Sequence, residues 1–187
     1  MKSIFLSLFF LMIFASTLSA QDISSPETFG RTLNLGVGLG YYGYAGHPMP
    51  AFHADYEIDV TKNFTLAPFV TYYAYDSYYY WGDQNNTYRN YDYRQTVIPT
   101  GVKGTYYFDR LLNAGSHWDF YLAGSLGFAI RINQWEDGYQ GENNIQGSSS
   151  GPYFDGHIGS EYHLTKRLGL VLDISTGIST FGLAVHL

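Results

Sequence analysis

The chain has 187 residues, of which 21 are Gly and 19 are Tyr, and only 14% are charged. Tyr favours strands and Gly favours turns and close strand packing, so this composition indicates a single all-β domain rather than a helical protein. The net charge of −6 argues against nucleic acid as a partner, and the absence of Cys excludes disulfides.

The first twenty residues predict a secretory signal peptide. Lys2 precedes an apolar run from Ile4 to Phe14, and small residues follow as far as Ala20. This run is too short for a transmembrane helix, so we expect it to be removed on export. Residues 21–30 then form a polar leader, and residues 31–187 form the domain.

From Arg31 onward, apolar and polar residues alternate with a period of two, which is typical of strands whose two faces lie in different environments. The clearest example is residues 51–60, where Phe52 and Ile58 alternate with Asp55 and Asp59. Segments of this kind occupy residues 31–42, 51–60, 64–72, 98–108, 120–133, 157–164, 168–174 and 178–187. The pattern predicts eight antiparallel strands. Pro68 and Pro99 interrupt two of them, and we expect these prolines to face each other at a bulge.

The connections between the predicted strands differ in length. Residues 61–63 and 165–167 form tight turns, whereas residues 81–93 and 137–152 form longer polar loops. In an even-stranded barrel the two classes lie at opposite ends, as in outer-membrane barrels with short periplasmic turns and longer extracellular loops. We therefore expect both ends of the domain in the periplasm and the two long loops at the cell surface.

Alternation alone leaves two interpretations open, a soluble barrel with an apolar interior and a membrane barrel with an apolar outer wall. The polar face carries small residues and sparse charges of both signs, which suits a narrow lumen with internal ion pairs. The apolar faces carry no charge in mid-strand, which favours contact with lipid. The predicted lumen network consists of Asp55, Glu57, Asp59, Lys103, Arg131, Glu161 and Asp173.

The signal peptide, the alternation, the eight predicted strands and the closing strand "ISTFGLAVHL" together resemble the small outer-membrane β-barrel family of Gram-negative bacteria, the OmpA/OmpX-like eight-stranded barrels. The resemblance covers residues 31–187. It implies a closed eight-stranded antiparallel transmembrane β-barrel in the bacterial outer membrane. It also implies that outer-membrane lipid and the barrel insertion machinery, which reads the last strand, are partners. In the family that strand usually ends in an aromatic residue, whereas this chain ends in Leu187.

The sequence offers little catalytic or metal-binding signal. His157 and Ser160 are three residues apart on one strand and would point to opposite faces, so they predict no catalytic pair. The carboxylates of Asp55, Glu57 and Asp59 are about 7 Å apart along the strand, which favours ion pairs with Lys103 and Arg131 over one shared metal ion. We predict no catalytic residue, no cofactor and no metal site.

The stretch Thr71–Gly82 holds seven aromatic residues. Asp76 would face outward on this strand, so it should lie at or above the lipid headgroups, and the rings beyond it should stand above the membrane. The candidate contact surface consists of Tyr78, Tyr79, Tyr80, Trp81, Tyr88, Tyr91 and Tyr93.

These features predict a non-enzymatic outer-membrane protein with a structural or surface-interaction role through its extracellular loops and an unidentified surface ligand. One alternative is a soluble secreted barrel that binds a small apolar ligand or a sugar. Such a protein would be recovered from the soluble periplasm or the medium without detergent. Another is a lipid A-modifying barrel enzyme, which would alter lipid A when overexpressed.

Overall fold

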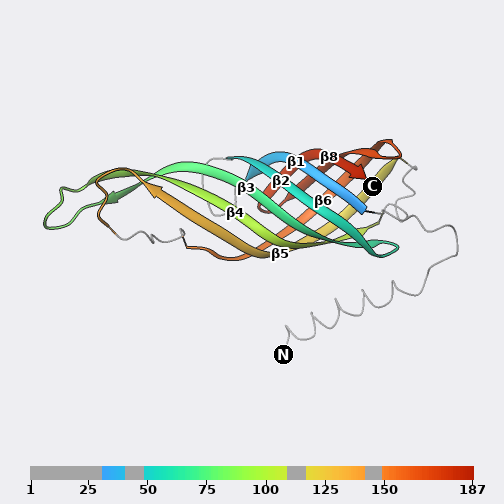
Figure 1. The fold of residues 1–187 in the computed structure, drawn as a ribbon, viewed down its shortest axis with the longest axis horizontal. Coiled ribbons are helices and arrows are strands. Elements are labelled where there is room, and N and C mark those ends of the chain that lie inside the picture. The colour runs from blue at the N-terminus through green and yellow to red at the C-terminus, as the bar shows by residue number, and fades with distance from the viewer. Residues whose placement is uncertain (1–30, 41–48, 109–116, 142–148) are drawn as a thin grey trace, which may run out of the picture.

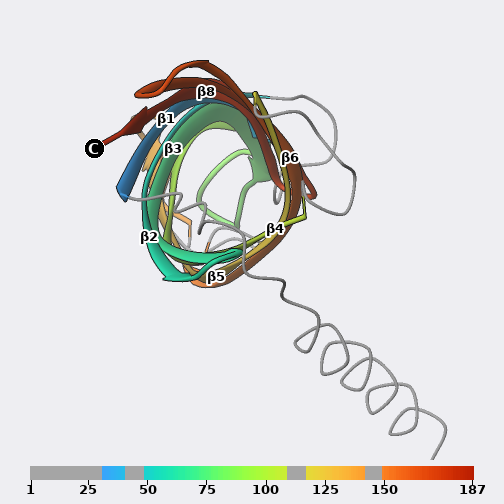
Figure 2. The same ribbon diagram turned by 90° about the vertical axis from the view of Figure 1, so that its right-hand side faces the viewer.

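The computed structural model describes residues 31–40, 49–108, 117–141 and 149–187. Within these ranges, eight antiparallel strands close into a barrel in which each strand pairs with its neighbour in the chain and the last pairs with the first (Figures 1 and 2). The strands are β1 Arg31–Gly40, β2 Met49–Thr61, β3 Phe64–Trp81, β4 Arg89–Tyr107, β5 Trp118–Trp135, β6 Gly151–Thr165, β7 Leu168–Ser175 and β8 Ile178–His186. The predicted closed eight-stranded all-β barrel is confirmed. The signal peptide, the polar leader and residues 142–148 of the second long loop lie outside the described residues.

The strands differ greatly in length, and this difference gives the barrel an extension at one end. β3, β4 and β5 have 18, 19 and 18 residues, whereas β7 and β8 have 8 and 9. A strand of about 9–11 residues is enough to span a bilayer. The surplus of β3, β4 and β5 projects past the other strands, at the end away from the carboxyl terminus (Figure 1).

Apolar side chains cover the outer wall of the barrel, and its interior holds polar side chains together with a smaller cluster of buried apolar ones that includes Phe69, Tyr73 and Val97. Val37, Phe52, Leu126 and Phe181 are each more than half exposed, while Asp55, Glu57 and Lys103 are buried. The period-two pattern therefore places its apolar face outward, as the sequence predicted. The described residues include no helix that is long and apolar enough to cross a membrane.

Two glycine pairs allow neighbouring strands to approach closely inside the barrel. Gly101 of β4 lies opposite Gly127 of β5, and a Cβ on Gly101 would come within 2.1 Å of the Leu126 carbonyl oxygen. Gly36 and Gly182 are paired in the same way across the β1–β8 seam, where a Cβ on Gly182 would lie 2.2 Å from the Leu35 carbonyl oxygen. Only glycine fits such a contact without displacing the backbone.

The two strand prolines do not face each other. Pro68 lies opposite Val102 on the outer face, whereas Pro99 points inward, is fully buried and lies opposite Ala129 of β5. The register between β3 and β4 is unchanged from Phe64 to Trp81, so the expected bulge is absent from this pair. Pairing is interrupted only between Val70 and Tyr73, which lie across from the segment that contains Pro99, because proline has no N–H to donate.

Candidate functional site

The centre of the lumen holds an ion pair between β4 and β2. Lys103 Nζ lies 2.6 Å from Asp55 Oδ2 and 3.9 Å from Glu57 Oε1. Asn34 of β1 donates from Nδ2 to both carboxylates, at 2.9 Å to Asp55 Oδ1 and 3.0 Å to Glu57 Oε1. All four side chains are buried, so the charges must be compensated within the protein rather than by bulk water.

Further hydrogen bonds satisfy the remaining oxygens of these carboxylates. Glu57 Oε2 accepts from Thr65 Oγ1 at 2.7 Å and from the Tyr107 hydroxyl at 2.8 Å. His53 Nε2 lies 2.9 Å from Asp55 Oδ2. The result is a polar network that links the first four strands through the lumen. Replacing any one member would leave its buried partners without a hydrogen bond or counter-charge.

The predicted lumen network does not extend to Arg131. Its guanidinium donates to the Ser149 carbonyl at 2.8 Å, at the start of the described segment before β6. Lys103 lies opposite Ser125, and Val97 lies opposite Arg131. The two cations therefore differ in height by the six positions from Ser125 to Arg131, or about 20 Å along the strand. Asp59 is half-buried near the other end of β2, and Thr65 of β3 lies opposite it.

A second group of polar side chains lies on β5, β6 and β7. Ser125 Oγ is 2.9 Å from His157 Nε2, and His157 Nδ1 is 2.8 Å from Asp173 Oδ1. The Tyr121 hydroxyl donates to the other Asp173 oxygen at 2.9 Å. This is the order of groups in a Ser–His–Asp triad, in which a carboxylate orients the base and the base contacts the nucleophile.

The space beside Ser125 is too small for the substrate of such a triad. The cavity lined by Ser125, His157 and Asp173 has a volume of about 10 Å³, which is room for about one water molecule. Phe69, Tyr153 and Ile178 line the same cavity. We therefore interpret these groups as part of the lumen filling, since an acyl group cannot reach the hydroxyl.

Sequence reasoning missed Asp155 as a member of the lumen network. Its carboxylate accepts from the Tyr153 hydroxyl at 2.9 Å, from Ser175 Oγ at 2.9 Å and from Thr176 Oγ1 at 2.6 Å. The sequence could have placed Asp155 in the lumen, because Tyr153, Asp155 and His157 occupy alternate positions of one strand and so share its inner face. Glu161 lies further toward the other end of β6, beside two histidines rather than beside Lys103.

The extension of β3, β4 and β5 is held together by aromatic rings on its inner face. Trp135 and Tyr139 stack with centroids 3.9 Å apart, and Tyr139 also contacts Trp81 and Tyr91, both at 5.3 Å. Tyr93 packs on Trp135 at 4.8 Å. Such ring pairs stabilise a hairpin by more than the burial of their apolar area alone would provide.

Charged groups add to this extension. Arg89 lies over the Tyr91 ring, 4.2 Å from its centroid, and pairs with Glu136 at 2.9 Å. Asp83 orders the tip between β3 and β4, because its Oδ1 accepts from the backbone N–H groups of Asn85 at 2.8 Å and Asn86 at 2.7 Å. These hydrogen bonds lower the pKa of the exposed Asp83 carboxyl below its ordinary value, and the bond from Asn85 contributes most.

The predicted contact surface therefore divides into two sets. Tyr78, Tyr80 and Tyr88 are exposed by 67%, 62% and 61%, and they point away from the inner cluster. Tyr91 is only 4% exposed and cannot form part of an open surface, which corrects the prediction for that residue. The cause is the same alternation that sorts the lumen, since the inner rings Tyr79, Trp81, Tyr91 and Tyr93 occupy the inward positions of β3 and β4.

An exposed ion pair separates the apolar wall from this extension. Asp76 and Arg94 lie opposite each other on the outer faces of β3 and β4, with 3.7 Å between Arg94 Nη1 and Asp76 Oδ1. Both side chains are more than half exposed. Below this pair the outer face is apolar, with Val70, Tyr72 and Val102 exposed.

Comparisons with known proteins give likenesses of structure only. No protein-family model matches the chain, and no curated protein matches it. Among solved structures, the chain is similar to Ail, the attachment invasion locus protein of Yersinia pestis, in complex with the heparin analogue sucrose octasulfate. That match has a TM-score of 0.48 and 6% identity and covers 83% of this chain and 95% of Ail. It is also similar to Neisserial surface protein A, with a TM-score of 0.47 and 18% identity over 84% of this chain and 94% of that one.

A third similar structure is the N-terminal β-barrel domain of OprF from Pseudomonas aeruginosa, with a TM-score of 0.43 and 14% identity over 83% of this chain and 95% of that one. Identities and TM-scores this low transfer no property of those proteins to this chain. The resemblance to eight-stranded outer-membrane barrels is thus confirmed in the strand number, the antiparallel order and the closure that the chain itself shows.

Proposed function

We propose that this protein is an integral outer-membrane β-barrel without a catalytic role, which presents the extension of β3, β4 and β5 at the cell surface. The observation that carries the proposal is the inverted distribution of side chains, with the Lys103–Asp55 ion pair buried inside the barrel and large apolar side chains exposed on its wall. Exposing this much apolar surface to water is unfavourable, whereas lipid accommodates it. Closure of the barrel also pairs the backbone groups that an open sheet edge would leave unpaired in lipid.

The height of the apolar wall supports the same proposal. On β3 the outward positions from Phe64 to Ala74 lie below the charged pair of Asp76 and Arg94. Ten steps at a rise of about 3.3 Å, with the strand tilted by about 40°, give about 25 Å, which is the height of the apolar band in outer-membrane barrels. The wall also has an open apolar groove of about 590 Å³, lined by residues that include Leu35, Phe52 and Phe181, and a lipid chain would fill it.

The interior gives little support to the two alternative functions. The cavity beside Lys103 and Asp55 has a volume of about 20 Å³ and the cavity beside Ser125 about 10 Å³, so neither holds a small apolar ligand or a sugar. A lipid A-modifying site would need its nucleophile within reach of the membrane, whereas Ser125 faces the lumen and is buried. We expect lipid A mass spectra to be unchanged by overexpression.

The proposal includes a route and an orientation. Residues 1–20 would direct export, the insertion machinery would read β8, and the tight turns at residues 62–63 and 166–167 would face the periplasm. The extension would then face outward, where the exposed rings Tyr78, Tyr80 and Tyr88 meet the medium.

Cysteine labelling tests both the location and the orientation, because the chain has no cysteine of its own. In a Gram-negative host, Tyr80→Cys should be labelled by a membrane-impermeant maleimide on intact cells. Lys166→Cys, in a tight turn, should be labelled only after the outer membrane is opened. Both variants should remain in the detergent-soluble membrane fraction. Recovery of the protein from the soluble periplasm or the medium would overturn the proposal, and the reverse labelling pattern would invert the orientation.

The exposed rings suggest contact with a ligand that has flat, CH-rich faces, such as a polysaccharide, because aromatic rings offer such faces a large apolar surface. The triple variant Tyr78→Ser, Tyr80→Ser and Tyr88→Ser should fold and insert normally and should lose at least about tenfold in binding, since each ring supplies an anchor of the kind that dominates interfaces. Binding of the purified barrel to an oligosaccharide panel measures this effect.

The matched control is Gln84→Ser, Asn85→Ser and Thr87→Ser, which alters exposed side chains of the same tip without removing rings. This control should bind like the parent. Equal binding by the ring variant, or binding of no oligosaccharide by the parent, would contradict a polysaccharide-contact role while leaving the membrane assignment unaffected.

A further inference from the structure

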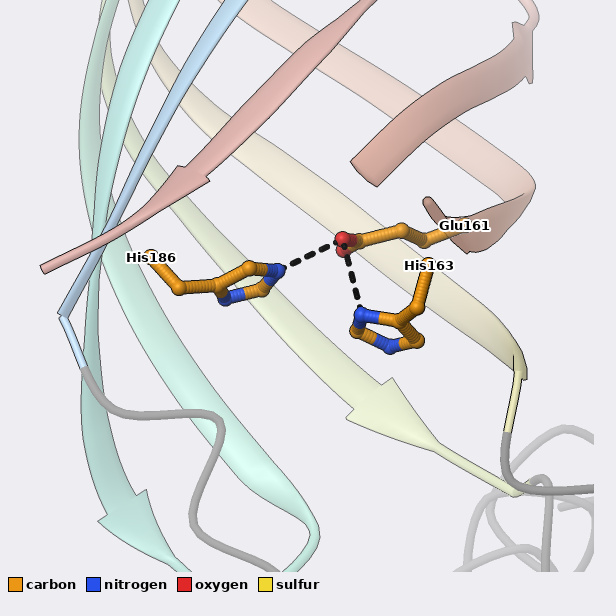
Figure 3. A group of neighbouring side chains, drawn as sticks. All are labelled: Glu161, His163 and His186. Atoms are coloured by element: carbon orange, nitrogen blue, oxygen red, sulfur yellow. Dashed lines mark hydrogen bonds and ion pairs between the residues drawn. The ribbon is translucent and has the colours of Figure 1, made fainter. Parts of the chain in front are cut away.

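Two histidines and two carboxylates gather in the lumen near the end of the barrel that carries the tight turns. Glu161 and His163 lie on the inner face of β6, and His186 reaches toward them from the end of β8 (Figure 3). His186 Nε2 is 2.7 Å from Glu161 Oε1, and His163 Nδ1 is 3.6 Å from the same oxygen. The ligand atoms of these three residues all lie within 4.8 Å of one another.

The ring nitrogen of each histidine that faces away from Glu161 has a hydrogen-bond partner. His186 Nδ1 is 2.9 Å from Thr32 Oγ1, and His163 Nε2 is 2.6 Å from Asp119 Oδ2. Metal-binding histidines characteristically donate their second ring N–H to a carboxylate, hydroxyl or carbonyl, which fixes the tautomer and directs the other nitrogen at the ion. Both rings are therefore oriented with their inner nitrogens toward one carboxylate oxygen.

We propose that Glu161, His163 and His186 form a binding site for a divalent transition-metal ion, for which Zn²⁺ is the fitting probe. A tetrahedral zinc ion with ligands at about 2.0–2.2 Å places its donors about 3.3–3.5 Å apart. The 2.7 and 3.6 Å separations in the structure lie on either side of that range. Two imidazoles and one carboxylate are a donor set that zinc accepts, with the fourth position left to water.

The charge at this place favours a cation. Asp119 of β5 lies directly opposite Glu161 of β6, and like charges at facing positions are destabilising unless something lies between them. In the described part of the chain, the ion-pair partners of these two carboxylates are histidines rather than Lys or Arg. A bound divalent ion would neutralise the excess negative charge while the histidines stay uncharged.

The strand between the two histidines leaves room for the carboxylate. Gly169 of β7 pairs with His163 on one side and with Ala184 on the other. A Cβ on Gly169 would come within 1.9 Å of Glu161 Oε1. The missing side chain therefore lets Glu161 cross β7 toward His186. The histidine side chains are 23% and 17% exposed, so an ion can enter from the adjacent barrel mouth.

The test uses the full chain purified from membranes in detergent, stripped with chelator and titrated with Zn²⁺ alone. We expect one zinc ion per chain by elemental analysis and a rise in the unfolding midpoint on zinc addition. His163→Gln and His186→Gln should each weaken binding at least about tenfold. Asp119→Asn and Thr32→Val should weaken it about tenfold through loss of ring orientation.

The matched control is His157→Gln, which removes another lumen histidine, the one between Ser125 and Asp173. This variant should bind zinc like the parent. The heat-dependent gel shift of each variant without zinc reports whether the barrel is folded. A folded parent that binds no zinc at submillimolar concentration would overturn the site, as would a His157→Gln variant that loses as much affinity as His186→Gln. Neither result bears on membrane location, which is measured by fractionation.

Discussion

Replacement of Lys103 with Met is expected to lower the free energy of unfolding of the barrel by about 3–5 kcal/mol, because it leaves two buried carboxylates without their cation. Lys103 Nζ is 2.6 Å from Asp55 Oδ2 and 3.9 Å from Glu57 Oε1. The Met side chain is similar in length to that of Lys and is apolar like its aliphatic part, so the substitution removes the charge with little change in volume. Denaturant unfolding of the refolded protein in lipid vesicles measures the loss.

Two controls separate the lost ion pair from other effects of substitution. Arg94→Met removes an exposed cation that pairs with Asp76 at 3.7 Å, and it should cost no more than about 1 kcal/mol. Adding Asp55→Asn to Lys103→Met should recover part of the stability, because one uncompensated charge is removed with its partner. A loss for Lys103→Met no larger than that for Arg94→Met would show that water in the lumen screens the network.

The sequence was sufficient to predict the number of strands and the face that each presents, but not their lengths. β3 and β4 extend into residues 81–93, which were expected to form a loop, and leave only residues 82–88 between them. Residues 51–60 show why the faces could be predicted, since Phe52 and Ile58 alternate with Asp55 and Asp59 and nothing else in the segment conflicts with a strand. Prolines were harder to place. Pro68 and Pro99 were expected to face each other from their distance to the loop tip, but the register puts Val102 opposite Pro68. A period of two gives the face of a residue and leaves its height undetermined.

The same limit explains the errors in the candidate site. Lys103 and Arg131 both had the charge and the inward face that an ion pair with Asp55 needs, but only Lys103 is at the right height. The contact between Ser125 and His157 could not be predicted, because residue spacing along one strand says nothing about contacts with the neighbouring strand. This contact joins β5 to β6 and becomes visible only when Ser125 is placed opposite Asp155.

The aromatic stretch shows what alternation does predict when it is applied throughout. Tyr79 and Trp81 follow Tyr73 and Tyr75 on the inner face, and Tyr78 and Tyr80 follow Asp76 on the outer face. Tyr91 could have been assigned inward by the same count from Gln95. The contacts of these inner rings with β5, above all with Trp135, could not be predicted, because they depend on the register between β4 and β5.

The outer wall gives the most direct test of the membrane assignment. Leu126 lies at the middle of the outward face of β5, between Val102 of β4 and Phe154 of β6, and is 60% exposed. Leu126→Arg should lower the free energy of unfolding from lipid vesicles by about 2–4 kcal/mol, since an arginine must be desolvated near the bilayer midplane. The yield of protein in the outer membrane should fall as well.

The same substitution distinguishes lipid from water, because the size of its effect on the free energy of unfolding depends on which of the two covers the wall. In water, an exposed Leu126→Arg change would alter stability by no more than about 0.5 kcal/mol and would improve solubility. The control is Tyr78→Arg, on the outer face of β3 beyond the Asp76–Arg94 pair, which should cost about 0–1 kcal/mol in either environment because it lies above the apolar wall. Equal effects of the two substitutions would mean that lipid does not contact Leu126. A large effect confined to Leu126→Arg would place the bilayer around the apolar wall and the exposed rings outside it.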